Sequence, residues 1–506
     1  MLDGLVLFGR SIGSFADPVT LGLIAASSLA GIVIGALPGL TATMGVALTT
    51  TLTLKMPPST ALLVLVCVYV GAIYGGSRSA ILLNIPGTPA NAAACLDGYV
   101  LAQKGLAGRA IGISTTGSVM GTLIGMFFLA IATPALGEVA LKFGAYEFFW
   151  LALFGVVISG NLTGGDPLKG WLAGFLGLFI AQVGQDGIHA YERFSFGNRD
   201  LAGGFQLIPA LVGAFGFAEV LSVLAERMAR PKIREFGSHL PRLGDVLKYW
   251  RTIIRSGIIG TFIGVVPGVG EDIASWSSYA AARRASKERE LFGKGSVEGL
   301  MAAETGDNAC VPGAMIPVLA LAVPGSAPAA VLMAAMIIHG VQPGPLIMVQ
   351  NPQFVYDIVA MMLFATLGIF VFGIALVRPL LKVLQIPREI IMPIVFVLCV
   401  IGSYAIAQRL FDVWTMLAFG VVGFVLRRYE YPMAPFVLGI VLGDILDKNL
   451  RRGLVLSDGD LTPFLTRPIS ALMFAICAVS ILMNFAAVRR AASRAWAAAT
   501  SWRRAA

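Results

Sequence analysis

The sequence predicts an all-α polytopic integral membrane protein with two inverted-topology repeats, broken helices or re-entrant hairpins in each repeat, and a further C-terminal helix. Three observations predict this class: an apolar composition, Pro-Gly elements that recur in the same order, and the distribution of Lys and Arg. Hydrophobic residues occupy 57% of the 506 positions, charged residues occupy 13%, and the mean hydropathy is +0.82. Soluble domains carry about 25% charged residues, so a soluble fold is excluded.

Two Pro-Gly elements occur in each half of the chain. In the first half they are 35–41 (GALPGLT) and 84–89 (NIPGTP), and in the second half 264–270 (GVVPGVG) and 323–328 (VPGSAP). Pro removes a backbone donor and Gly loosens a helix, which leaves polar groups that lipid cannot satisfy. Breaks at corresponding positions of two halves are typical of the binding site of a secondary transporter, although Pro and Gly are also frequent as plain kinks in membrane helices.

Apolar runs and polar gaps divide the chain into four parts. We expect a first transmembrane repeat at 1–226, a cytoplasmic basic linker at 227–250, a second repeat at 251–455, and a C-terminal transmembrane helix with a basic tail at 456–506. Several runs are shorter than the ~20 residues that a full span needs, which favours half-helices or re-entrant segments. The first residues lack the basic region of a signal peptide, so no cleavage is expected.

The basic residues predict the orientation, because Lys and Arg in short loops favour the cytoplasm. The stretch 227–255 carries eight of them and is predicted to be cytoplasmic, as is the C-terminal tail. Equivalent loops of the two halves differ in charge: 283–294 carries five basic residues, whereas its first-half counterpart has only Lys55. This opposition predicts inverted topology. The cluster Lys448, Arg451 and Arg452 is an exception, because the same topology places it outside.

Residues in the Pro-Gly breaks and polar residues beside them, mostly in the first half, are the candidates for binding an anionic substrate. Ionisable groups at membrane depth are costly and usually line a substrate path. Arg78 offers a planar fork that matches a carboxylate, although an ion pair with a buried acid is the alternative. The candidate substrate-binding residues are Pro38, Gly39, Thr41, Thr43, Ser77, Arg78, Ser79, Asn84, Pro86, Gly87, Thr88, Pro267, Gly268 and Ser326.

The second half holds the acids and is the candidate region for ion coupling. Carboxylate, hydroxyl and freed carbonyl oxygens suit a small hard cation or a proton carrier. Acids also favour helix N-termini, which is the alternative for Glu271 and Asp272. The candidate coupling residues are Glu271, Asp272, Ser275, Glu304, Thr305, Asp307 and Asn308.

Other function classes find little support in the sequence. The three histidines are isolated and the five cysteines lie scattered through apolar runs, so neither an enzyme nor a metal site is indicated beyond Na⁺, and no cofactor is expected. The net charge of +9 comes mainly from loop and tail residues, as membrane orientation requires, so nucleic acid is not an expected partner. A channel remains the alternative to a coupled transporter.

Four segments together resemble the TctA family: 35–43, 74–89, 264–272 and 304–309. This family is the large membrane subunit of the bacterial tripartite tricarboxylate transporters, and the resemblance covers nearly the whole chain. It implies import of a di- or tricarboxylate, coupled to Na⁺ or H⁺, across the bacterial inner membrane. It also implies two protein partners, a small TctB-like membrane subunit and a TctC-like periplasmic solute-binding protein.

Overall fold

The computed structural model describes residues 2–162, 166–225, 243–384, 386–482 and 484. Within these ranges the secondary structure is almost wholly helical, with one two-stranded sheet. The chain folds into two compact units, unit 1 from 1–142 and 205–429, and unit 2 from 143–204 and 430–506. Each predicted repeat therefore contributes residues to both units.

Eight helical segments within the described ranges are long and apolar enough to cross a membrane, which agrees with the predicted all-α polytopic membrane protein. They are Pro18–Ala36, Pro58–Leu83, Ala102–Ala140, Ala145–Leu162, Leu207–Ala225, Gln353–Ala375, Glu389–Ala407 and Leu410–Arg428.

The first half of unit 1 begins with a helix that the sequence analysis did not anticipate, α1 (Leu2–Phe15), followed by α2 (Pro18–Ala36). Asp17 caps α2 by accepting hydrogen bonds from the backbone N–H groups of Val19 and Thr20. A turn at 37–41 separates α2 from α3 (Ala42–Thr53), and α4 (Pro58–Leu83) follows. Helix α4 ends at Leu83, so the break comes directly before the second Pro-Gly element at 84–89.

The second half of unit 1 contains the same succession of elements. It consists of α12 (Leu243–Val265), α13 (Gly270–Ala285), a short η5 (Arg289–Leu291), α14 (Val297–Leu321) and α15 (Ala327–Ile338). Helices α4 and α14 end alike, each on a residue in the left-handed conformation, Asn84 with φ 57° and Ala322 with φ 56°. The second Pro-Gly element follows directly in both cases.

The first Pro-Gly elements form matching turns. The backbone N–H of Leu40 donates to the carbonyl of Leu37 over 3.0 Å, and that of Val269 donates to Val266 over 3.4 Å. The glycine at the third turn position has positive φ in both cases, 96° at Gly39 and 72° at Gly268. Proline followed by a positive-φ glycine is the sequence signature of a type II turn, so each Pro-Gly pair reverses the chain between two helices.

Helix packing repeats in the same register. A Cβ at Gly35 would meet the backbone carbonyl oxygen of Ala72, and a Cβ at Gly264 would meet that of Cys310. Gly87 approaches the carbonyl oxygen of Gly35 as closely as Gly325 approaches that of Gly264. These positions need glycine because the backbones touch. The packing of α2 on α4 is therefore reproduced by α12 on α14, while inverted topology stays a prediction.

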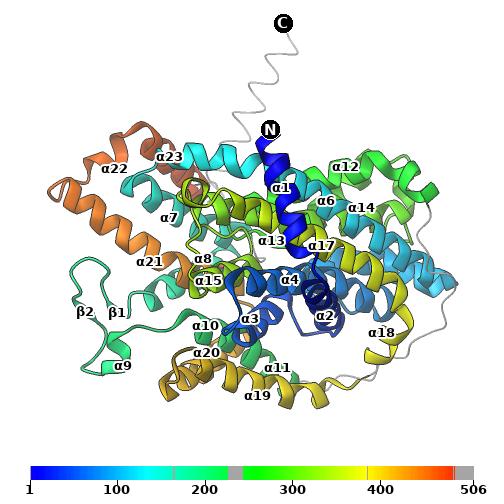
Figure 1. Ribbon diagram of the computed structural model, residues 1–506, viewed down its shortest axis with the longest axis horizontal. Helices are drawn as coiled ribbons and strands as arrows, with labels where there is room; N and C mark the ends of the chain where they lie inside the picture. The colour runs from blue at the N-terminus through cyan, green and yellow to red at the C-terminus, as the bar shows by residue number, and fades with distance from the viewer. Residues whose placement is uncertain (1, 163–165, 226–242, 385, 483, 485–506) are drawn as a thin grey trace, which may run out of the picture. The chain divides into compact units, whose positions relative to one another are not determined.

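The remaining elements of unit 1 surround these helices (Figure 1). The long helix α6 (Ala107–Ala140) packs along α14, and α17 (Gln353–Ala375) packs on α4 and α6. The others are η1 (Pro89–Asn91), α5 (Ala92–Ala94), η2 (Cys95–Tyr99), η3 (Ala102–Leu106), α10 (Leu207–Leu211), η4 (Val212–Phe217), α11 (Ala218–Ala225), α16 (Ile347–Gln350), α18 (Val377–Val383), α19 (Arg388–Ala407) and α20 (Leu410–Arg428).

Unit 2 is smaller, and its helices α7 (Ala145–Leu162) and α8 (Pro167–Ile180) pack against α21 (Met433–Leu456). Close packing of α8 on α21 depends on glycines, since a Cβ at Gly177 would meet the carbonyl oxygen of Phe436. The other elements are β1 (Gly184–Gln185), β2 (Glu192–Arg193), α9 (Arg199–Ala202), α22 (Thr462–Thr466) and α23 (Pro468–Leu482). The two strands form an antiparallel hairpin that the sequence analysis did not anticipate.

Two predicted parts fall wholly or partly outside the described residues. The basic tail lies outside them, as does the linker up to residue 242, and its remainder forms the start of α12. The repeat boundaries and the orientation in the membrane stay predictions.

Candidate functional site

A cluster of polar side chains lies where α4, α6 and α14 pack together. We call it the buried polar centre, because each member is at most 1% exposed although the surrounding helices are apolar. Polar groups in such a place are costly unless they are hydrogen-bonded, so their partners decide what the cluster can do. Its members are Ser77, Arg78, Asn91, Ser114, Thr115, Ser118, Glu304, Asp307 and Asn308.

Glu304 lies on α14 and is held through one carboxylate oxygen. Its Oε2 accepts hydrogen bonds from the hydroxyls of Ser77 at 2.6 Å, Ser114 at 2.9 Å and Ser118 at 3.1 Å. Ser114 and Ser118 lie four residues apart on α6 and so face the same side of that helix. Its other oxygen, Oε1, has no hydrogen-bond partner among the described residues. One acceptor of the buried carboxylate is therefore left over.

Asp307 lies nearly one helical turn further along α14 and is held by two side-chain amides. The Nδ2 of Asn308 donates to its Oδ1 over 2.7 Å, and the Nδ2 of Asn91 donates to its Oδ2 over 3.2 Å. Thr88 donates to the Oδ1 of Asn91 over 2.6 Å, which fixes the orientation of that amide. The Asn91 amide also reaches Ser77 at 3.1 Å. Asn91 thus joins the first-half break to an acid of the second half.

Arg78 is the largest fully buried side chain of the described residues. Its guanidinium lies 4.2 Å from the centre of the Tyr74 ring, as in a cation–π contact. It donates to Thr115 over 3.0 Å and to Ser114 over 3.4 Å, while its Nε has no partner among the described residues. No acid in the described ranges lies within ion-pairing distance of it, so the direct ion pair considered as the alternative is not formed. Arg78 and Glu304 are connected through the Ser114 hydroxyl.

A second polar contact joins the first half to the second-half breaks. The Tyr69 hydroxyl, on α4, hydrogen-bonds both the carboxylate of Glu271 and the hydroxyl of Ser326, the latter at 2.8 Å. Glu271 lies in the first turn of α13, and Ser326 caps α15 by accepting from the N–H of Ala329 at 3.4 Å. The predicted residues Glu271 and Ser326 therefore both contact the hydroxyl of Tyr69. Asp272 shares the first turn of α13 but is less buried.

The other predicted residues have local partners. Thr41 caps α3 through the N–H of Met44, and Asn84 is exposed at the end of α4. The hydroxyls of three further candidates donate to backbone carbonyls, those of Ser79, Thr305 and Ser275. The remaining candidates lie in the turns or beside them: Pro38, Gly39, Thr43, Pro86, Gly87, Pro267 and Gly268.

Several site residues were missed by the sequence analysis, namely Tyr69, Tyr74, Asn91, Ser114, Thr115 and Ser118. A signal existed for two of them, because Ser114 and Ser118 are small polar residues at i and i+4 in a predominantly apolar helix. Asn91 gives no such signal, since its role depends on packing against a residue 216 positions away.

The buried polar centre is rich in oxygen and poor in bases. Arg78 is its one base, and no base in the described ranges lies within 4.0 Å of the carboxylate of Glu304 or Asp307, whereas ion pairs elsewhere in the chain are as short as 2.8 and 2.9 Å. The oxygens of Glu304 (Oε1) and Asn308 (Oδ1) have no donor among the described residues. Carboxylate, amide and hydroxyl oxygens are the ligands of hard cations. The described residues contain no group of three or more His, Cys, Asp or Glu that could hold a metal ion.

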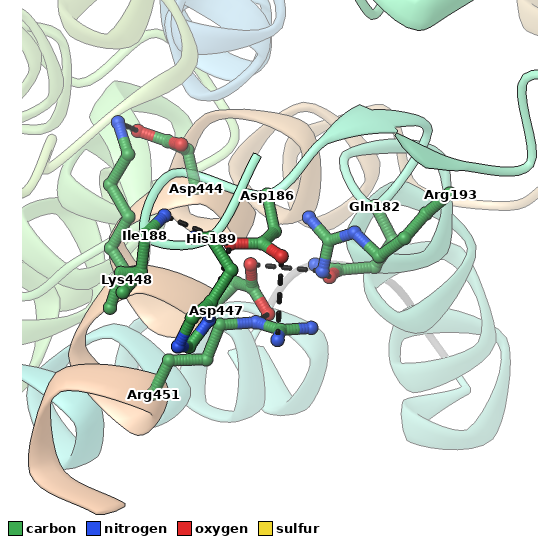
Figure 2. A network of polar contacts seen from close by, with 9 residues as sticks. All are labelled: Gln182, Asp186, Ile188, His189, Arg193, Asp444, Asp447, Lys448 and Arg451. Atoms are coloured by element: carbon green, nitrogen blue, oxygen red, sulfur yellow. Dashed lines mark hydrogen bonds and ion pairs between the residues drawn. The ribbon is translucent and has the colours of Figure 1, made fainter. Parts of the chain in front are cut away.

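Unit 2 contains a polar cluster of a different kind, which we call the ion-pair network (Figure 2). Arg193 on β2 contacts Asp447 on α21 at 2.9 Å, and Arg451 contacts Asp447 at 3.0 Å and Asp186 at 3.7 Å. Lys448 pairs with Asp444 at 2.7 Å. The network ties the β1–β2 hairpin to α21. Lys448 and Arg451 are therefore both paired with acids. They are two of the three basic residues that the predicted topology places outside.

Asp186 is the acid of this network that the hairpin backbone holds. The backbone N–H of His189 donates to it over 2.6 Å and that of Ile188 over 2.9 Å. The hydrogen bond from His189 has the largest effect on this carboxylate, and the one from Ile188 and the positive charge of Arg451 act in the same direction. Together they lower the pKa of the Asp186 carboxyl to about 2. The carboxylate is thus fixed as an anion by the hairpin backbone.

Comparison with known proteins gives a family match and two relatives. A family model described as the tripartite tricarboxylate transporter TctA family matches residues 21–438. An uncharacterized 52.8 kDa protein in the TAR-I ttuC′ 3′ region of Agrobacterium vitis is 36% identical over 96% of this chain and 97% of its own length. An uncharacterized protein in the TAR-II ttuC′ 3′ region of the same organism is 34% identical over 44% of this chain and 93% of its own length. No solved structure matches.

Proposed function

Because the chain belongs to the tripartite tricarboxylate transporter TctA family, we propose that this multi-pass membrane transport subunit imports a di- or tricarboxylate together with Na⁺ or H⁺. A transport subunit follows from the family, and the buried polar centre supports the finer proposal. The observation that carries it is that one fully buried arginine and two buried acids lie in the same cluster, while no base in the described ranges lies within ion-pairing distance of either acid.

Arg78 is proposed as the anchor of the substrate carboxylate. Its guanidinium is oriented by Tyr74 and Thr115, and its Nε donor is left without a partner among the described residues. A planar guanidinium binds a carboxylate through two parallel hydrogen bonds, which an ammonium group cannot do. The backbone N–H groups of the Pro-Gly turns would supply further donors, because the hydroxyls of Ser77 and Thr88 already donate to Glu304 and Asn91.

Glu304, Asp307 and Asn308 are proposed as the coupling site. An anion that enters a negative-inside cell works against about 2.3 kcal/mol per charge per 100 mV, so cations must enter with it. The unpartnered oxygens Glu304 Oε1 and Asn308 Oδ1 would accept Na⁺ or a proton at this point. Glu271, near Tyr69 and Ser326, is the second candidate position.

The family also supports a proposal for partners and location. We place the protein in the bacterial inner membrane with a cytoplasmic C-terminus, bound to a small TctB-like membrane subunit. A TctC-like periplasmic protein would deliver the substrate. The predicted topology places the basic residues Lys448 and Arg451 outside, which is unusual for that side of the membrane. Both are paired with acids, so local ion pairs account for their presence there.

The test is uptake of a radiolabelled carboxylate by proteoliposomes that contain the reconstituted complex. A Na⁺ gradient and a pH gradient are imposed separately, and each of the three proteins is omitted in turn. We expect accumulation above the external concentration with one ion gradient, and its loss when the solute-binding protein is omitted. Equilibration without accumulation under every gradient would instead establish a channel.

A further inference from the structure

A groove on one face of α12 combines two arginines with apolar side chains. It is shallow and open, with a volume of about 380 Å³, and is lined by Trp250, Arg251, Ile254, Arg255, Ile258 and Ile259. These residues form pairs spaced four positions apart, so they follow one face of the helix over two turns. Polar side chains occur only at one end of the groove, and its continuation is aliphatic.

The groove begins at a kink. Tyr249 has non-helical torsion angles, φ −108° and ψ 19°, and it divides α12 into a short amphipathic segment and a longer segment that packs on α6 and α14. The outer face of the longer segment is apolar and exposed, with Ile254 at 45% and Phe262 at 62%. In a membrane protein such a face contacts lipid. Trp250, 51% exposed beside the kink, lies where tryptophans mark the boundary between lipid and water.

Among the described residues, the two arginines are the charges of this helix without an acidic partner. Asp245 is paired with Arg109 at 2.8 Å and Lys248 with Glu288 at 2.9 Å. Within the described residues no acid lies within 4.0 Å of Arg251 or Arg255, and the nearby carboxylate of Glu298 is occupied by the hydroxyls of Thr252 and Ser286.

Both guanidinium groups are oriented with spare donors. Arg255 donates to Thr252 over 3.2 Å, and its Nε is buried without a partner among the described residues. Arg251 lies over the Trp250 ring at 5.4 Å. Residues four apart on a helix have side chains about 6 Å from each other at Cβ, so both forks reach one phosphate.

We propose that this groove binds one anionic phospholipid. The phosphate lies between Arg251 and Arg255, Trp250 lies at the level of the headgroup, and an acyl chain follows Ile254, Ile258 and Ile259. A free phosphate ion would use the arginines but leave the aliphatic part of the groove unexplained, and a zwitterionic lipid would bring its own cation next to two arginines that have no acid within 4.0 Å among the described residues. Basic pockets on membrane helices recognise anionic headgroups in this way.

The experiment is native mass spectrometry of the detergent-solubilised full-length chain titrated with phosphatidylglycerol, phosphatidylcholine or inorganic phosphate. The variant Arg251→Gln/Arg255→Gln removes both charges, and at about 1 kcal/mol per basic residue it should bind phosphatidylglycerol roughly 30-fold more weakly. The matched control is Arg283→Gln/Arg284→Gln, which removes two exposed arginines of α13 and should bind as the unaltered chain does.

A variant with only one substitution keeps the test decisive even where the double variant misfolds. Arg251→Gln leaves the Arg255 hydrogen bond to Thr252 in place, and we expect roughly fivefold weaker binding from the loss of one charge. Equal affinity of the double variant and the unaltered chain for phosphatidylglycerol would overturn the proposal. So would equal affinity for phosphatidylcholine, or displacement of the lipid by millimolar inorganic phosphate.

Discussion

The buried polar centre of unit 1 and the ion-pair network of unit 2 both contain acids and bases, but they satisfy their acids by different means. In unit 2, Asp447 contacts two arginines, at 2.9 and 3.0 Å. In unit 1, Glu304 accepts three hydroxyl hydrogen bonds on one oxygen, and Asp307 accepts from two amides. The first arrangement meets the charge of its acids with bases, including Asp186 Oδ2, which has Arg451 at 3.7 Å and no hydrogen bond among the described residues. The second leaves acceptors over, as a site for a transported cation requires.

The two clusters also differ in the free energy that their charged groups contribute to stability. Partly exposed ion pairs contribute about 0–1 kcal/mol each, because water already solvates their charges. A buried carboxylate costs several kcal/mol unless its partners compensate for lost hydration. Changes in the buried polar centre should therefore alter transport strongly, and changes in the ion-pair network should alter stability weakly.

The largest expected effect is that of Glu304→Gln. The substitution removes the negative charge that the three serine hydroxyls stabilise. The NH₂ group of the new amide cannot accept a hydrogen bond, so at least one of these hydroxyls loses its acceptor or must reorient. At 1.5–3 kcal/mol for a charged hydrogen bond, uptake should fall roughly ten- to hundredfold. Proteoliposome uptake at saturating substrate measures it.

Glu298→Gln is the matched control for this variant. Glu298 lies on the same helix and also accepts hydroxyl hydrogen bonds, from Thr252 and Ser286, but it is outside the buried polar centre. We expect uptake within about twofold of the unaltered complex. Equal losses of uptake in the two variants would show that transport depends to the same extent on any buried acid of α14. The proposed site would then lose its support.

The next effect in size is that of Arg78→Lys. Lysine keeps the charge but loses the planar fork and the stacking on Tyr74, so the apparent affinity for the carboxylate should fall roughly tenfold. Subunit assembly should not change. Arg109→Lys, in a partly exposed pair with Asp245, is the control and should keep its affinity. An unaltered affinity for Arg78→Lys would remove Arg78 from the substrate site.

A smaller effect is expected in unit 2 from Asp447→Asn. It removes the acid shared by Arg193 and Arg451, and the free energy of unfolding should decrease by about 1 kcal/mol or less. Denaturation of the detergent-solubilised protein measures this change, and uptake by the reconstituted complex should remain within twofold. A tenfold loss of uptake would show that the network takes part in transport.

The smallest effect is the pH dependence that Asp186 contributes. Its pKa is lowered from 3.8 to about 2 in the folded protein, so it stabilises the fold above pH ~4 and loses this contribution as the pH falls toward 2. The melting temperature of the unaltered protein should therefore decrease more steeply between pH 4 and 2 than that of Asp186→Asn. Parallel curves would contradict the lowered pKa.

Much of the fold was predictable because composition and Pro-Gly spacing are local properties of the chain. Apolar runs predicted the membrane helices, and the positive φ of Gly39 and Gly268 explains why glycine follows proline at both turns. The hairpin at 184–193 was missed since its strands are two residues long and depend on contacts with α21. Helix α1 was missed because its 14 residues are fewer than a full span needs and include Asp3, and Arg10 with serines and glycines after the apolar run at 5–8.

The site was predictable only in part. Ser77, Arg78, Glu304, Asp307 and Asn308 stood out as polar residues beside the breaks, and the structure brings them together. Asn84 stood out for the same reason, but it ends α4 in the left-handed conformation that asparagine tolerates well. Asn91 and the α6 serines join the site through packing between distant segments, which one sequence does not reveal.

The most direct test of the central claim is the dependence of uptake on the driving ion in the variants Asp307→Asn and Glu271→Gln. Initial uptake rates are measured in proteoliposomes across a range of Na⁺ concentrations and of pH gradients, with Glu298→Gln as the control. The account predicts that at least one of the two variants has a shallower dependence on the driving ion while its preference among carboxylates is unchanged. If both variants keep the ion dependence and steepness of the unaltered complex, the buried acids are structural and do not couple transport to the ion.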